Sequence, residues 1–254
     1  MKTKKLTIII LIFGFFMVSF FECSDAGIAW DYKIVNCECE EDEIPLQGEI
    51  SEETEIFKIE AKIPEIGNEK IDRELSDFVT KIISDFKQEN PELPVINGQK
   101  PSWKNELWIS PKIYEYSEDI KSVRFNVYQF TGGAHGMTSV FTKTYNLKTG
   151  EEITLDDLFQ NKQNLLLTIG PIVRHNLKVK LGKMADDKWI NKGTSETNLE
   201  NYKNWVLEKG GLRIIFSYYQ VGPRPAGMPE VLVPWEKINS ILKPSFLILK
   251  QKNT

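Results

Sequence analysis

The sequence predicts an α+β protein in which antiparallel strand meanders pack with two main helices. Several segments alternate apolar and polar residues with the period of two that is typical of strands. Two longer segments repeat apolar residues every three or four positions, as amphipathic helices do. The strands follow one another in runs rather than alternating with helices, which favours α+β over α/β. The chain has 254 residues, 41% hydrophobic and 27% charged, which is ordinary for a globular protein.

Residues 1–26 have the pattern of an export signal. The first five residues include three lysines, and Leu6–Phe21 is an apolar run without charge. Cys23 follows this run as the lipid acceptor of a bacterial lipoprotein would, so it is our lipidation candidate. Glu22 is not the small residue that such a site needs, whereas small residues around Ala26 fit ordinary cleavage. Both processing routes stay open, and we expect an extracytoplasmic protein that is periplasmic, membrane-anchored or secreted.

Residues 27–54 are expected to form an acidic flexible tether. Nine acidic residues lie between Glu38 and Glu55, with no lysine or arginine among them. Self-repulsion and a shortage of large apolar groups keep such a segment extended. Cys37 and Cys39 lie two residues apart, where a disulfide would be strained, so a bridge and a pair of free thiols both stay open.

Residues 55–150 are expected to form an N-terminal α+β subdomain. Alternation predicts a strand over 56–63, and the stripe from Ile71 to Phe86 predicts a helix over 68–88 with Asn68 as its N-cap. The segment 106–117 contains a proline, which favours an edge strand. Two further alternating segments, 120–130 and 138–147, are joined by the glycine-rich loop GGAHG.

Residues 151–243 are expected to form a C-terminal α+β subdomain. Thr154 and Asp157 have the spacing of a capping box before a short helix, and a second long helix is predicted over 163–183. A hairpin about Gly210 and Gly211 follows, then a strand over 230–235 and a short helix over 236–242.

The glycine loop raises the main question of chemistry, because it holds one of only two histidines. Gly132, Gly133 and His135 could form a tight connection that shapes a binding edge, or His135 could act as a general base. Catalysis would require a nucleophile and an orienting carboxylate, and no G-x-S-x-G or H-E-x-x-H motif occurs. His175 lies alone on a predicted helix. We therefore assign no catalytic residue, expect no metal site and no cofactor, and favour the binding edge.

A second candidate is the loop YYQVGPRPAG, which joins two predicted strands. Tyr218, Tyr219 and Arg224 are of the types that dominate protein interfaces, and tyrosine also stacks on sugars. These residues therefore indicate the rim of a binding surface, next to the His135 loop, while a rigid structural loop is the alternative.

Three motifs in order resemble a bacterial envelope family that pairs two domains of unknown function. They are GGAHG, YNLKTGEEITLDDLF and GGLRIIFSYYQVGPRPAGMPEVLVPW. The family includes the extracellular part of the lysozyme-sensing anti-sigma factor RsiV and the N-terminal region of PdaC-type peptidoglycan deacetylases. The resemblance implies a recognition or accessory domain without chemistry of its own, and we expect neither a sigma-binding segment nor a catalytic domain in this chain.

These observations predict an exported cell-envelope protein that binds a protein such as lysozyme, or cell-wall glycan. The alternative is a hydrolase that acts on envelope polymers through His135 and nearby carboxylates. A net charge of −4 argues against a nucleic-acid partner, which requires a basic face. Contact with a membrane is expected only through a lipid or an N-terminal anchor.

Overall fold

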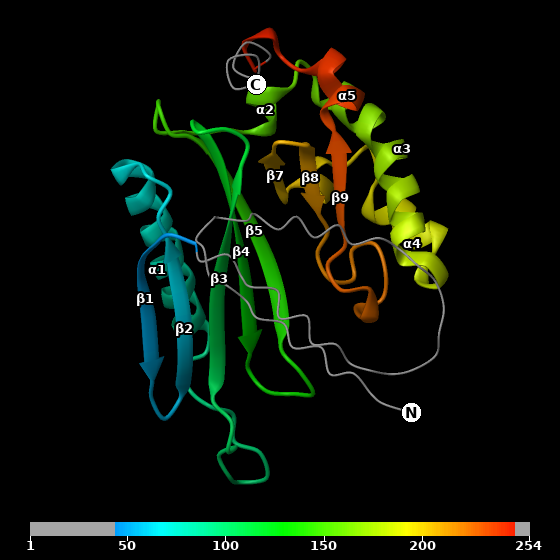
Figure 1. The fold of residues 1–254 in the computed structure, drawn as a ribbon. Coiled ribbons are helices and arrows are strands. Elements are labelled where there is room, and N and C mark those ends of the chain that lie inside the picture. Colours follow the sequence, from blue (N-terminus) through cyan, green and yellow to red (C-terminus); the bar gives the residue numbers. More distant parts are fainter. Residues whose placement is uncertain (1–43, 247–254) are drawn as a thin grey trace, which may run out of the picture. The chain divides into compact units, whose positions relative to one another are not determined.

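The computed structural model describes residues 44–246 (Figure 1). These residues form an α+β structure with one six-stranded sheet and one three-stranded sheet, which confirms the predicted fold class. The strands are β1 Leu46–Glu53, β2 Phe57–Pro64, β3 Asn105–Glu115, β4 Ile120–Phe130, β5 Met137–Asn146, β6 Glu151–Glu152, β7 Trp205–Glu208, β8 Gly211–Ile215 and β9 Glu230–Pro234. The α-helices are α1 Glu69–Glu89, α2 Leu155–Leu158, α3 Lys162–Leu181, α4 Asp187–Gly193 and α5 Trp235–Ile238.

The six-stranded sheet is ordered β1-β2-β3-β4-β5-β6. Its neighbours are antiparallel except for β2 and β3, which are parallel and are connected through α1. The segment 106–117 was expected to be an edge strand, but it forms most of β3, which lies inside the sheet between β2 and β4. Pro111 is tolerated there because the pairing with β2 ends at Ile109, so the missing N–H removes no hydrogen bond from that pairing.

Helix α1 covers one face of this sheet, as its sequence predicts. Asn68 accepts hydrogen bonds from the backbone N–H groups of Lys70 and Ile71, so the predicted N-cap is confirmed. The apolar stripe of α1 packs with side chains of β2, β3 and β4 in one core. This core comprises Ile59, Ala61, Ile63, Ile66, Ile71, Leu75, Val79, Ile83, Phe86, Leu107, Ile109, Val123, Phe125, Val127 and Tyr145.

The expected tether over residues 27–54 is wrong for its last part, because Leu46–Glu53 is strand β1. It pairs with β2 from Leu46 to Glu53, and Ile50 packs against the α1 core. Glu49 and Glu53 alternate with these inward positions and are exposed, whereas Glu52 lies on the inward side and pairs with Lys87 of α1 at 2.5 Å. The other N-terminal predictions, including the signal, Cys23, Cys37 and Cys39, lie outside the described residues. Within residues 44–246, no helix is long and apolar enough to cross a membrane.

The C-terminal part packs α3 and α5 against the three-stranded sheet β7-β8-β9. Its core includes Leu158, Val173, Leu177, Ile214 and Val233. The predicted hairpin is confirmed, since β7 and β8 pair up to Glu208 and Gly211. A Cβ on Gly211 would lie 2.2 Å from the carbonyl oxygen of Val233, so only glycine allows β9 to approach this closely. Helix α4 and the 3-10 helix Leu199–Tyr202 were not predicted from the sequence.

Candidate functional site

Among residues 44–246, the face of the six-stranded sheet opposite α1 is covered at one end only. There β7 crosses it: the backbone N–H of Trp205 donates to Thr142 Oγ1 at 3.1 Å, and that of Leu207 donates to Ser122 Oγ at 2.9 Å. A small apolar cluster of Val140 with residues of β7 and β8 completes this junction. The other end of the face, where β3 begins and β4 ends, holds Trp108, which is 41% exposed.

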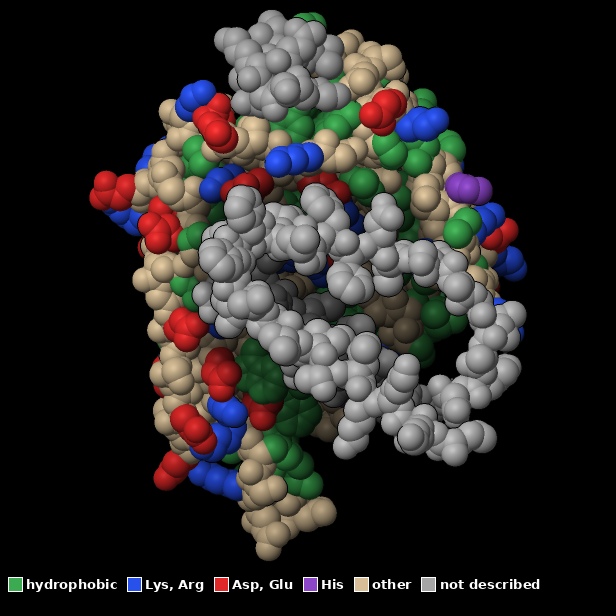
Figure 2. Space-filling view, viewed as in Figure 1, with side chains coloured by type: hydrophobic (Ala, Val, Ile, Leu, Met, Phe, Trp, Pro, Cys, Tyr) green, Lys and Arg blue, Asp and Glu red, His purple; other side chains and the backbone are tan. Residues whose placement is uncertain are grey.

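Four aromatic residues at this open end form what we call the aromatic platform. Trp108 and Tyr128 are partners across β3 and β4, and their rings stack at 4.9 Å with an interplanar angle of 26°. Trp103 and Phe130 meet edge to face at 5.6 Å. Figure 2 shows hydrophobic side chains exposed over the lower part of β3–β5, beside mixed lysines and glutamates on β1 and β2. Contiguous exposed apolar side chains on a protein surface often mark an interaction site.

The predicted glycine loop lies against this platform. Gly132 and Gly133 have φ of 104° and 97°, a region that residues with a Cβ rarely adopt. A Cβ on Gly132 would lie 2.6 Å from the ring of Trp103. A Cβ on Gly136 would lie 2.4 Å from the ring of Tyr128. The glycines therefore allow the loop to contact two of the four platform rings.

His135 is exposed at the tip of this loop. Its Nδ1 lies 3.1 Å from the carbonyl oxygen of Gly136, so the nitrogen that makes this bond carries the proton. Among the described residues, no carboxylate makes a hydrogen bond or ion pair with His135. His175 is exposed on α3, far along the chain from this loop. Within residues 44–246, no group of three or more His, Cys, Asp or Glu side chains could hold a metal ion.

The structure brings Arg224 to the glycine loop, as the sequence led us to expect. Arg224 Nη2 donates to the carbonyl oxygen of Gly136 at 3.3 Å, and the guanidinium is half-buried. Tyr218 and Tyr219 are placed differently, because their part of the loop is held by α4. The indole Nε1 of Trp189 donates to the carbonyl oxygen of Tyr219 at 2.7 Å, and Tyr219 is 45% exposed. Arg224 is therefore the member of this loop that borders the platform.

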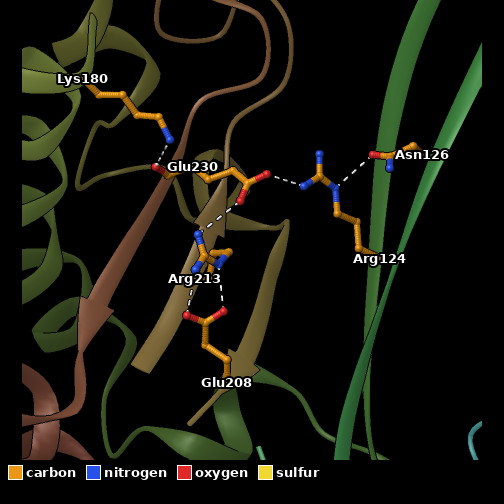
Figure 3. A network of polar contacts seen from close by, with 6 residues as sticks. All are labelled: Arg124, Asn126, Lys180, Glu208, Arg213 and Glu230. Carbon is orange, nitrogen blue, oxygen red and sulfur yellow. Dashed lines mark hydrogen bonds and ion pairs between the residues drawn. The ribbon is translucent and has the colours of Figure 1, made fainter. Parts of the chain in front are cut away.

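A charged network fixes the position of the Arg224 loop (Figure 3). Glu230, at the start of β9, accepts a hydrogen bond from Arg124 on β4 and another, at 3.3 Å, from Arg213 on β8. Arg213 also forms a two-bond pair with Glu208, at 2.8 and 2.9 Å, which raises the pKa of the guanidinium. Arg124 is 8% exposed and donates further to Asn126 Oδ1 at 3.0 Å. The network joins the two sheets at Arg124, four residues before Tyr128 on β4.

The platform itself was not predicted as a site. Alternation over 120–130 placed Tyr128 and Phe130 on the face opposite the core, which was the available signal. Trp108 lies in the strand that was expected at an edge. An exposed aromatic residue on an edge strand does not by itself indicate a binding site. Which end of the face remains open depends on where β7 packs, and no local pattern encodes that.

Two family models match the chain in succession. Residues 50–138 match the family described as deacetylase PdaC, and residues 156–236 match a protein family of unknown function, DUF3298. The chain is 28% identical over 197 residues to peptidoglycan-N-acetylmuramic acid deacetylase PdaC of Bacillus subtilis, covering 78% of this chain and 41% of that protein. It is 30% identical over 122 residues to immunogenic protein MPT64 of Mycobacterium tuberculosis, covering 48% and 52%. The chain thus spans about half or less of the length of these relatives.

Two solved structures share the fold. One is a DUF3298 family member from Bacteroides fragilis, with a TM-score of 0.54 and 16% identity, covering 81% of this chain and 96% of that one. The other is a DUF3298 family protein from Pseudomonas aeruginosa, with a TM-score of 0.51 and 18% identity, covering 80% and 96%. At these identities the likeness concerns the fold alone.

Proposed function

Because the chain carries a PdaC-type domain at residues 50–138 followed by a DUF3298 domain at residues 156–236, we propose that it is a non-catalytic, extracytoplasmic binding domain for cell-wall glycan. The observation that supports this most directly is the aromatic platform. The relative from Bacillus subtilis is named for a peptidoglycan sugar, and a domain that holds the polymer would serve such an enzyme.

The chemistry of the platform suits a sugar chain. Trp and Tyr offer a large, rigid apolar surface with a polar edge at small entropic cost. The apolar face of a pyranose ring stacks on such surfaces, while its hydroxyl groups bond to polar neighbours. Trp108 and Tyr128 lie on adjacent strands and stack on each other, so the pair offers its outer ring faces and ring edges to a ligand. The strands hold these two side chains in place, so little conformational entropy is lost on binding.

The geometry around His135 supports binding rather than hydrolysis. A general base needs an orienting partner and a reacting group within hydrogen-bonding reach. Nδ1 of His135 contacts only its neighbouring carbonyl among the described residues, and the ring stands in solvent. Its position fits a loop that borders the platform.

Sedimentation with insoluble peptidoglycan tests this proposal, with Trp108→Ala as the variant and Phe141→Ala as the control. Both side chains are 41% exposed, but Phe141 lies on the α1 face, beside Phe78. We expect Trp108→Ala to weaken binding at least about tenfold, as loss of a central aromatic contact does, and Phe141→Ala to bind like the wild type. Equal binding by both variants would contradict the proposal. A parallel assay that showed binding to lysozyme alone would instead favour a protein partner.

A further inference from the structure

We propose that the platform selects glycan segments that carry both a free amino group and a carboxylate, as muramic acid does after loss of its N-acetyl group. This inference rests on the proposed function and specifies the ligand of the same site. It follows from the opposite charges at the two ends of the platform.

One end of the row carries glutamates and lysines, with the glutamates in excess. Glu60 on β2 is the register partner of Trp108, and Glu106 lies two residues before Trp108 on β3. Side chains two apart on a strand point to the same face, so the Cα atoms of Glu60 and Glu106 lie about 5–7 Å from that of Trp108. A protonated amine at this place would meet carboxylates and an aromatic face together, which is the combination that binds ammonium groups well.

The lysines of this region do not cancel that charge. Lys104 pairs with Glu53 at 2.7 Å, which lowers the pKa of that carboxyl, and Lys58 lies 3.6 Å from Glu60. Glu53, Glu60 and Glu106 thus face two ammonium groups, and three negative charges less two positive ones leave one negative charge. The pair of Lys58 with Glu60 is exposed and long, so it is weak and open to exchange for a ligand amine.

The other end of the row is basic. Arg224 bonds to the carbonyl oxygen of Gly136, and Gly136 touches the ring of Tyr128. Among the described residues, no carboxylate pairs with Arg224, although its guanidinium is half-buried and has four further N–H donors. A half-buried guanidinium with spare donors is suited to a carboxylate ligand. The exposed His135 beside it adds positive charge when it is protonated.

The order across the sheet is Glu60, Trp108, Tyr128 and then the loop that Arg224 binds. From β2 to β5 this row crosses three strand spacings, about 14 Å. That length suits two or three linked sugars. A sugar ring would pack against the outer face of the aromatic pair, with the amine of one muramic residue toward β2 and the lactyl carboxylate of another toward Arg224.

Titration calorimetry at neutral pH with three peptide-free glycan probes tests the inference. The probes are a muramyl glycan with all N-acetyl groups, the same glycan with free amines on muramic acid, and a fully deacetylated chito-oligosaccharide that lacks carboxylates. We expect the wild type to bind the muramyl glycan with free amines at least about fivefold more tightly than either other probe.

The variants assign this preference to its residues. Glu106→Gln should bind the two muramyl glycans equally, and Arg224→Gln should lose the advantage of the muramyl glycan with free amines over the chito-oligosaccharide. Glu69→Gln, on the opposite face and 93% exposed, should behave as the wild type. Equal wild-type affinity for the two muramyl glycans would overturn the inference and leave the proposed function standing. No binding of any probe or of whole peptidoglycan would overturn both.

Discussion

Replacing Glu230 by glutamine should destabilise the fold much more than removing any exposed carboxylate. Glu230 is the carboxylate that joins Arg124 of the first sheet to Arg213 of the second. Its side chain is 23% exposed and that of Arg124 is 9% exposed. Removing one partner of a buried pair costs about 3–5 kcal/mol, because the other charge stays buried and unpaired. Partial exposure of Glu230 and the bond from Arg124 to Asn126 reduce this cost, so we expect about 2–3 kcal/mol.

The matched control is Glu69→Gln, which removes an exposed helical pair with Arg73 at 3.5 Å and should change stability by less than about 0.5 kcal/mol. Urea unfolding followed by circular dichroism and by tryptophan fluorescence measures both variants. A further variant, Arg124→Met with Glu230→Leu, should recover most of the loss, because an apolar pair of similar volume often replaces a buried ion pair without cost. If Glu230→Gln and Glu69→Gln shift the midpoint equally, the network does not hold the sheets together.

Three further predictions concern the fold and the loop. Phe78→Ala should cost about 2–3 kcal/mol in urea unfolding, below the usual range for buried phenylalanine because this ring is partly exposed; a loss under about 1 kcal/mol would contradict the packing. His135→Ala should fold normally and lose at most about 0.5–1.5 kcal/mol, and a hydrolytic activity that vanished with it would contradict a binding role. Asp157→Asn should cost about 0.5–2 kcal/mol at pH 7, because the Asp157 carboxylate accepts bonds from the hydroxyl and from the backbone N–H of Thr154, which lower its pKa. Because the folded-state pKa of Asp157 is lowered, this stability is present above the usual aspartate range and is lost as pH falls through the folded-state pKa. The thermal unfolding midpoints of the wild type and of Asp157→Asn should therefore converge below about pH 4.

The sequence predicted those features of the fold that depend on local patterns. Asn68 and the apolar stripe after it define α1, because a cap and a period of 3.6 residues leave few alternatives. The parallel pairing of β2 with β3 could not be predicted, since alternation shows which face of a strand is apolar but not its neighbour. The strand β1 was missed because its charges outweighed the weak alternation of Leu46 and Ile50.

The candidate site was predicted in part for the same reason. The glycine loop stands out by composition, and Arg224 by its setting in a loop rich in glycine and proline. Their contact joins residues 88 positions apart, which the order of motifs alone does not reveal. The open position of Trp108 depends on where the second sheet packs, so only the three-dimensional structure shows it.

The acidic strand β1 has a consequence for how the protein behaves at high concentration. It forms the outer edge of the described six-stranded sheet, where unpaired backbone groups can recruit a strand from another molecule. Glu49, Glu52 and Glu53 lie along this edge, and a second copy that paired with it would bring further carboxylates opposite them. Each of the three glutamates also pairs with a lysine of its own molecule, and an edge lined with such charged side chains disfavours fibre-like association through β1. The acidic residues that made this segment look disordered in the sequence therefore protect a sheet edge against aggregation.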